Sequence, residues 1–236
     1  MKLHSVGTSL FALGLLLVAA VAQAQTSVGS VSRLTGEQTS SAQTLGGAAR
    51  KLKEGDSLFA AERIRTGAGT VLEIEFTDKS RMTLGPNTEF EVESYRQTAG
   101  QEAFSSRVIK GAFRFVSGLI AKRKRENVHI TIAVATIGIR GTHFEGEVTE
   151  RQEKDGKTVD ASAQVALLEP EGEAANAIVV ENKFGSVVID KPGFGTEIPD
   201  EKSPPSPIKR MQLRTIDNVL RAIRTPGQSG GPARRP

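Results

Sequence analysis

Residues 133–146 read AVATIGIRGTHFEG, and the strands on either side lead into and out of this stretch. It begins with an apolar run, Ala133–Ile139, which is too short for an ordinary helix. Ala, Val, Thr and Ile suit a pleated, buried surface, so we interpret the run as an interior strand. Gly138 and Gly141 interrupt it, and glycine inside a strand usually marks a bulge or a close backbone approach. We therefore expect the chain to turn a corner here inside a β core.

Upstream of this stretch, apolar and polar residues alternate with period two. Val71–Phe76 alternates apolar residues with Glu, and the same period returns at Arg81–Leu84 and Glu89–Glu93. Such alternation predicts half-buried strands, and the short turns between them predict a three-stranded meander. Its polar face would carry glutamates on the outer strands with Arg81 between them, which is typical of a solvated surface with weak ion pairs.

The remaining body repeats this pattern of short strands and frequent turns. Arg107–Val116 is predicted to be a strand pair or one bent strand, with Gly111 at its middle. Val128–Val134 and Thr158–Leu168 also alternate. About a dozen short strands without a strong amphipathic helix indicate an all-β body.

The N-terminus has the pattern of a secretory signal peptide over residues 1–24. Leu10–Val21 is apolar and is followed by Ala22, Gln23 and Ala24, so we expect cleavage after Ala24 and a mature chain that starts at Gln25. The apolar run is far short of the ~20 residues that span a bilayer, although an uncleaved anchor is the alternative. We expect a periplasmic product whose mature chain has no transmembrane segment.

The composition argues against several classes of site. Cysteine and tryptophan are absent and there is one tyrosine, so we expect no disulfide, no thiolate nucleophile and few base-stacking platforms. No GxGxxG motif occurs, and Gly156-Lys157-Thr158 resembles the end of a P-loop whose first glycine is replaced by Arg151. We expect no nucleotide, no metal and no other cofactor.

The charge is divided between an acidic body and a basic tail. Residues 25–201 hold 22 Lys and Arg against 26 Asp and Glu, a net charge of −4, whereas residues 202–236 hold eight against one, a net of +7. We predict a body over 25–198, a proline-rich linker over 199–207, a basic amphipathic helix over 208–225 and a disordered tail over 226–236. The helical spacing is carried by Ile216, Val219, Leu220 and Ile223. Docking on the body, binding a partner and lying on a membrane surface remain alternatives for this helix.

Two sets of cations are candidates for contact with an acidic surface or an anionic polymer. They are Lys122, Arg123, Lys124 and Arg125 in the body, and Arg210, Arg214, Arg221 and Arg224 in the tail. A run of four cations is also typical of a solvated loop tip.

At this point the order of elements resembles the FecR domain family. The motifs that carry the resemblance are "EGD" at 54–56, "IRTG" at 64–67, "LEIEFTDKS" at 72–80, "MTLGPNT" at 82–88, "GAFR" at 111–114 and "IGIRGTHF" at 137–144. The resemblance covers about residues 50–190 and implies an exported, elongated β-roll or β-sandwich. The best-known members look like periplasmic sensors that pass a receptor's signal to a sigma factor. We expect this chain to depart from them, because its sequence shows no pattern of a cytoplasmic anti-sigma segment or of a transmembrane helix.

No catalytic constellation is evident. His129 and His143 match no metal-ligand spacing, and the glutamates of the alternating strands lie on a solvated face. Asp56 and Asp78 are predicted to cap turn amides. We also expect Gly141→Val to destabilise the body, because a β-branched residue does not follow a glycine-only backbone.

The sequence therefore favours a non-enzymatic binding, scaffold or signal-sensing module of the cell envelope, with another envelope protein as its partner. A carbohydrate-active or hydrolytic envelope enzyme and an anionic-polymer binder remain alternatives.

Overall fold

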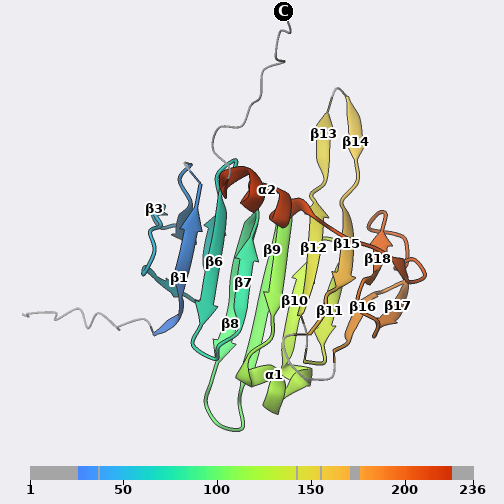
Figure 1. The fold of residues 1–236 in the computed structure, drawn as a ribbon, viewed down its shortest axis with the longest axis horizontal. Helices are drawn as coiled ribbons and strands as arrows, with labels where there is room; N and C mark the ends of the chain where they lie inside the picture. The colour runs from blue at the N-terminus through green and yellow to red at the C-terminus, as the bar shows by residue number, and fades with distance from the viewer. Residues whose placement is uncertain (1–25, 37, 142, 155, 171–175, 225–236) are drawn as a thin grey trace, which may run out of the picture.

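The structure, a computed structural model, describes residues 26–36, 38–141, 143–154, 156–170 and 176–224. Two sheets face each other across one core and share a single long strand, β9 (Ala103–Val116). Among the described strands every pairing is antiparallel except that of β9 with β10. The predicted all-β sandwich is confirmed, and Figure 1 shows α1 and α2 at opposite ends of it.

The first sheet has the order β4 (Ser57–Phe59), β1 (Ser27–Thr35), β6 (Val71–Phe76), β7 (Arg81–Leu84), β9, β12 (His143–Thr149), β15 (Ser162–Leu167), β18 (Phe194–Ile198) and β19 (Lys209–Arg210). The second has the order β3 (Arg50–Lys51), β2 (Ser41–Thr44), β5 (Glu62–Arg65), β8 (Glu89–Arg96), β9, β10 (Val128–Ile132), β11 (Ala135–Ile139), β16 (Ile178–Asn182) and β17 (Gly185–Ile189). A separate hairpin, β13 (Gln152–Lys154) with β14 (Lys157–Val159), projects from the body.

Strand β9 passes from one sheet to the other at Gly111. Residues 103–110 pair with β8 and residues 111–116 pair with β7 and β12. Gly111 has φ +97°, and a Cβ there would lie 2.3 Å from Thr88 Oγ1 and 2.5 Å from Thr88 Cα. Only glycine fits this backbone conformation at such close approach. The predicted bend at the middle of this strand is confirmed.

Two buried threonines hold the corner. The Thr88 hydroxyl donates to the carbonyl of Ala112 at 3.1 Å, and the Thr66 hydroxyl donates to the carbonyl of Gly85 at 2.6 Å. The Thr66 hydroxyl also accepts from the backbone N–H of Thr88 at 2.9 Å. Polar groups of a sharp turn are thus satisfied inside the core, where an unpaired one would cost about 1–3 kcal/mol.

Phenylalanines fill the space between the sheets on both sides of the bend. Ring centroids lie 4.8 Å apart for Phe76 and Phe104, 5.7 Å for Phe104 and Phe115, and 5.9 Å for Phe115 and Phe144. These rings come from β6, both halves of β9, and β12, and all are at most 1% exposed. The aromatic contacts therefore tie the two sheets into one core.

The predicted meander is wrong. β6 pairs with β7 and places Glu75 opposite Arg81, but β8 pairs with β5 and β9 in the other sheet. The turn at 85–88 carries the chain across the sandwich, with Asn87 at φ +53°. Alternation reports that one face of a strand is buried, but it does not report in which sheet the strand lies.

The single strand predicted at Ala133–Ile139 is also wrong. Ile132 pairs with Ala135, so Ala133 and Val134 form a two-residue turn between β10 and β11. No Gly, Asn or Pro marks this turn, and Val134 stays buried, so the apolar pattern continues through it. Gly138 is regularly paired on both sides and is not a bulge, whereas Gly141 has φ +68°. Residue 142 lies outside the described residues.

The cation run at 122–125 is not a loop tip. Lys122 and Arg123 end α1 (Leu119–Arg123), and Arg125 begins a short 3-10 helix, η1 (Arg125–Asn127). Asp78 holds the start of α1, because its carbonyl accepts from Leu119 N at 2.7 Å and its carboxylate from Ile120 N at 3.3 Å. A buried acceptor outside the helix thus supplies a cap that the local sequence does not contain.

The predicted linker does not separate the tail from the body. Pro205 is buried, the carbonyl of Ser203 accepts from Asn182 Nδ2 at 2.8 Å, and Ser206 N donates to the carbonyl of Glu197 at 2.9 Å. Proline lacks an N–H group, but its carbonyl and the N–H groups of its neighbours can still form hydrogen bonds. An extended proline-rich segment can therefore bind along a sheet edge.

The predicted helix over 208–225 begins later, as α2 (Thr215–Arg224). Lys209 and Arg210 instead form β19 against β18, and Met211 N donates to the carbonyl of Gly193 at 2.8 Å. The two residues of β19 pair with the open edge of β18, and this extended pairing excludes them from the first turn of a helix. Within α2, Ile216 is 3% exposed and lies beside Ala112 and Gly85, so the helix docks on the body.

Replacing Gly111 by Ala is expected to destabilise the fold by more than about 3 kcal/mol, because positive φ and overlap with Thr88 add together. Urea denaturation measures the change. The control is Gly100→Ala, since Gly100 also has positive φ (+81°) but nothing within 4 Å of a Cβ. Gly100→Ala is expected to cost about 1 kcal/mol. Equal losses in the two variants would contradict the corner described above.

Ile216→Ala is expected to loosen α2, since losing a buried Ile side chain costs about 2–5 kcal/mol. Limited trypsin digestion with mass spectrometry should show faster cleavage after Arg214 and Arg221, with the body intact. Ile208→Ala is the matched control, because Ile208 is 36% exposed. Identical cleavage rates in both variants would mean that Ile216 does not hold the helix.

Candidate functional site

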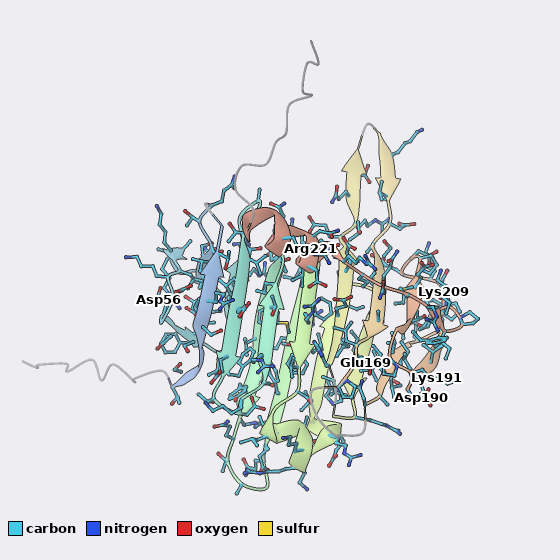
Figure 2. The ribbon with its side chains drawn as sticks, in the orientation of Figure 1. Asp56, Glu169, Asp190, Lys191, Lys209 and Arg221 are labelled. Carbon is cyan, nitrogen blue, oxygen red and sulfur yellow. The ribbon has the colours of Figure 1, made fainter. Side chains whose placement is uncertain are left out.

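The two predicted cation sets lie on different parts of the molecule. Lys122, Arg123, Lys124 and Arg125 are all exposed at the α1 end, whereas Arg221 is exposed on α2 at the opposite end. Arg210 lies in β19 next to Lys209, which Figure 2 labels at the side of the body. The Arg210 guanidinium is 5.7 Å from the Phe194 ring centroid. Arg214 is exposed and donates to Gln212 Oε1 at 2.6 Å, and the Arg224 side chain lies outside the described part. The two sets therefore do not form one surface.

A groove of about 320 Å³ opens beside the first set. We call it the Gly138 groove, and its lining consists of Arg125, Glu126, His129, Gly138, Ile139, Arg140 and Val179. The sheet register explains its shape, because His129, Gly138 and Val179 lie side by side across β10, β11 and β16. Gly138 has no side chain, so a hollow remains on the outer face of the second sheet.

The charged residues of the Gly138 groove differ from those elsewhere on the second sheet. Arg63 and Arg65 lie within 3.3 Å of Glu89, and Arg107 lies 2.6 Å from Glu93. Within the described part of the chain, neither Arg125 nor Arg140 has an ion-pair partner. Two exposed guanidinium groups therefore line the hollow without an ion pair, and Glu126 contributes one carboxylate to the same lining.

The sequence predicts Arg125 as a contact residue but does not point to its neighbours in the groove. In the sequence, Arg140 is part of a family motif, and His129 lies on the polar face of a predicted strand. If β10 is paired with β11 so that His129 lies opposite Gly138, the sequence also predicts that His129 and Arg140 lie close to this hollow. That pairing was hidden by the unmarked turn at Ala133 and Val134.

A larger hollow of about 430 Å³ lies near the tip of β2 and is less suited to a charged ligand. Arg63 and Arg65 line it, and both already pair with glutamates. Leu45 at its rim is fully exposed. Its polar groups are thus largely matched within the protein.

The buried carboxylate of greatest interest is Glu145, which lies 2.9 Å from Arg114 Nη2. Asp217 of α2 accepts from the same nitrogen at 3.0 Å. Burial raises the pKa of Glu145, and the hydrogen bond and positive charge of Arg114 offset only part of this effect. The space beside this cluster is about 10 Å³, so it holds at most about one water and no substrate. The pair of carboxylates therefore serves to fix α2 to the body.

The two histidines have different surroundings. The Nδ1–H group of His143 donates to the carbonyl of Glu169 at 2.9 Å, and its backbone N–H donates to Asn176 Oδ1 at 3.3 Å. His129 is exposed in the groove. Within the described ranges no group of three His, Cys, Asp or Glu side chains is placed to hold a metal ion.

The predicted capping aspartates are confirmed. Asp56 accepts from Lys53 N at 2.8 Å, and Asp78 accepts from Ser80 N at 3.1 Å. The Tyr95 hydroxyl donates to Asp78 at 3.1 Å, and its pKa is raised by burial and by the nearby Asp78 charge. Asp78 thus accepts hydrogen bonds from the turn at Ser80, from Tyr95 and from the start of α1.

Glu145→Gln gives a pH-dependent test of this arrangement. A carboxyl whose pKa is higher in the folded state than its ordinary value of 4.5 binds more protons when folded. The wild-type stability therefore falls as pH rises from about 4.5 through the raised pKa, and this fall is absent in the variant. We expect the free energy of unfolding of Glu145→Gln, minus that of the wild type, to rise across this window. Urea titrations at successive pH values measure it, and a falling or constant difference would contradict the raised pKa.

Part of this chain is similar to known proteins. The family model described as FecR protein matches residues 62–169. Two crystal structures of a candidate anti-sigma factor from Parabacteroides distasonis are similar, each with 11% sequence identity and a TM-score of 0.48 over 67% of this chain. The matched region spans 64% and 63% of those chains, less than two thirds of their length. No curated protein matches the chain.

No helix within the described ranges is both long and apolar enough to cross a membrane. The family match runs from β5 to β15, so it includes the turn at 85–88, the bent strand β9 and the cationic wall of the Gly138 groove. Over residues 62–169, the chain is similar to the FecR protein family.

Proposed function

We propose that this chain is a periplasmic binding and scaffold module of envelope signalling that acts without catalysing a reaction. The FecR domain supports a regulatory role, and the leader pattern of residues 1–24 supports export. In this proposal the body over 25–198 is joined by the basic C-terminal region, whose Ser203, Ser206 and Ile216 contact it. The observation that carries the proposal is the exposed cationic surface at the α1 end, where Arg125 and Arg140 have no ion-pair partner within the described residues although Arg123 lies 4.0 Å from Glu102.

The partner in this proposal is another envelope protein with an acidic surface. The four cations of 122–125 are exposed on α1 and η1, which are anchored to the sandwich through Asp78. Charges held on an anchored element can steer a partner of opposite charge. The route to a sigma factor through a membrane-spanning segment is not part of the proposal.

A second candidate is binding of an anionic polymer at the same end. It is favoured by the absence of ion-pair partners for Arg125 and Arg140 within the described part. Such binding should weaken steeply with added salt, because counterions are displaced on association. An envelope enzyme is not proposed, since the space beside buried Glu145 and its neighbour Asp217 is too small for a substrate.

Site-specific photocrosslinking in cells tests the main proposal. A photoreactive residue at position 124 is expected to give a discrete adduct with an envelope protein, whereas the same residue at exposed Arg33 on β1 is not. Periplasmic extraction and N-terminal sequencing should recover a chain that starts at Gln25. Retention in the cytoplasm, or the same adducts from both positions, would overturn the proposal.

A further inference from the structure

Glycine at position 138 is not required by the fold. Its φ is not positive, and a Cβ there would lie 3.9 Å from the nearest atoms, Val179 Cβ and the Val179 carbonyl. Glycine in the middle of a strand weakens it relative to Ala, because glycine loses more backbone freedom on folding. Gly111, Gly146 and Gly195 are different, because a Cβ at each would come within 2.6 Å of another atom. Gly138 therefore keeps a hollow open rather than solving a backbone problem.

The floor of this hollow offers a flat surface without free backbone groups. Gly138 pairs with His129 on one side and with Val179 on the other, so ladder bonds already involve the backbone around it. A peptide strand consequently cannot add here, since strand addition needs an open sheet edge. The floor suits a compact ligand that lies against Gly138 and the Val179 side chain.

The rim combines donors with one acceptor. Arg125 and Arg140 supply charged donors, His129 supplies a ring nitrogen, and Glu126 supplies a carboxylate. Arg140 is held in place at its backbone, where its N–H donates to the carbonyl of Ala177 at 3.0 Å. Guanidinium groups bind carboxylates with charge-assisted hydrogen bonds.

Glu126 indicates which anion fits. The dianion of a phosphate monoester carries more negative charge and no hydroxyl donor, so a carboxylate in the rim disfavours it. A ligand with one carboxylate and several hydroxyl groups can use the cations and the acceptor together. A volume of about 320 Å³ lies at the lower end of small-ligand sites, which are commonly about 300–1,000 Å³.

We propose that the Gly138 groove binds an acidic sugar, a unit of a uronic-acid polymer. Its carboxylate binds Arg125 and Arg140, its hydroxyl groups bind Glu126 and His129, and its ring lies on Gly138. This inference deepens the second proposed function and rests on it, because it names the polymer.

Calorimetry of the purified mature chain tests the inference with a galacturonic acid trimer and its neutral methyl ester. The acid is expected to bind at least about tenfold more tightly than the ester, since hydrogen bonds to a charged carboxylate are stronger than those to a neutral ester. Gly138→Val should weaken acid binding by a similar factor while keeping or raising the melting midpoint. Arg125→Gln with Arg140→Gln should do the same, whereas Arg33→Gln should leave binding unchanged.

A further measurement distinguishes failure of the acidic-sugar site from failure of anionic-polymer binding in general, the proposed function on which this inference rests. Polyphosphate is measured under the same conditions. If it binds as tightly as the acid trimer, or if Gly138→Val binds the trimer like the wild type, the acidic-sugar site is wrong. In those cases a general anionic-polymer binder would still be tested by the salt dependence of polyphosphate binding.

Discussion

The close approach of Gly111 to Thr88 is the constraint on which the rest of the fold depends. It lets one strand leave the second sheet and enter the first, so both sheets grow outward from β9. The parallel partner of its first half is β10, which carries His129 into the Gly138 groove. The partner of its second half is β12, which carries Glu145 towards α2. A backbone bend in the core thus sets the positions of two surfaces at opposite ends.

The polar groups around this bend show how a sharp corner is made stable. Thr66 and Thr88 satisfy the turn at 85–88, while Asp78 satisfies the turn after β6 and the start of α1. Arg114 then joins β9 to β12 and α2 through two carboxylates. Apart from the contact of Asp78 with Ser80, each of these contacts joins segments that are at least 19 residues apart in sequence. They fix α1 and α2 to the body.

Much of the fold could be predicted from local pattern, and the failures have physical causes. Alternation identified the strands of 71–93, and Gly111 correctly marked a bend. Alternation could not tell which sheet receives β8, because burial of a face looks the same in either sheet. The turn at Ala133 and Val134 has no turn-forming residue, and the tail's strand β19 depends on an edge that only the folded body provides. The Gly138 groove depends on register across three strands, so Arg125 was identified while Arg140 and His129 were not.

The central claim is that the shared strand makes the two sheets one cooperative unit. Native-state hydrogen exchange of the amides of Val108 and Phe113, on either side of Gly111, tests it most directly. Cooperative units exchange with a common free energy of opening. The account predicts the same opening free energy for both amides, equal to that of global unfolding. Different opening free energies, with one sheet exchanging while the other stays protected, would contradict it.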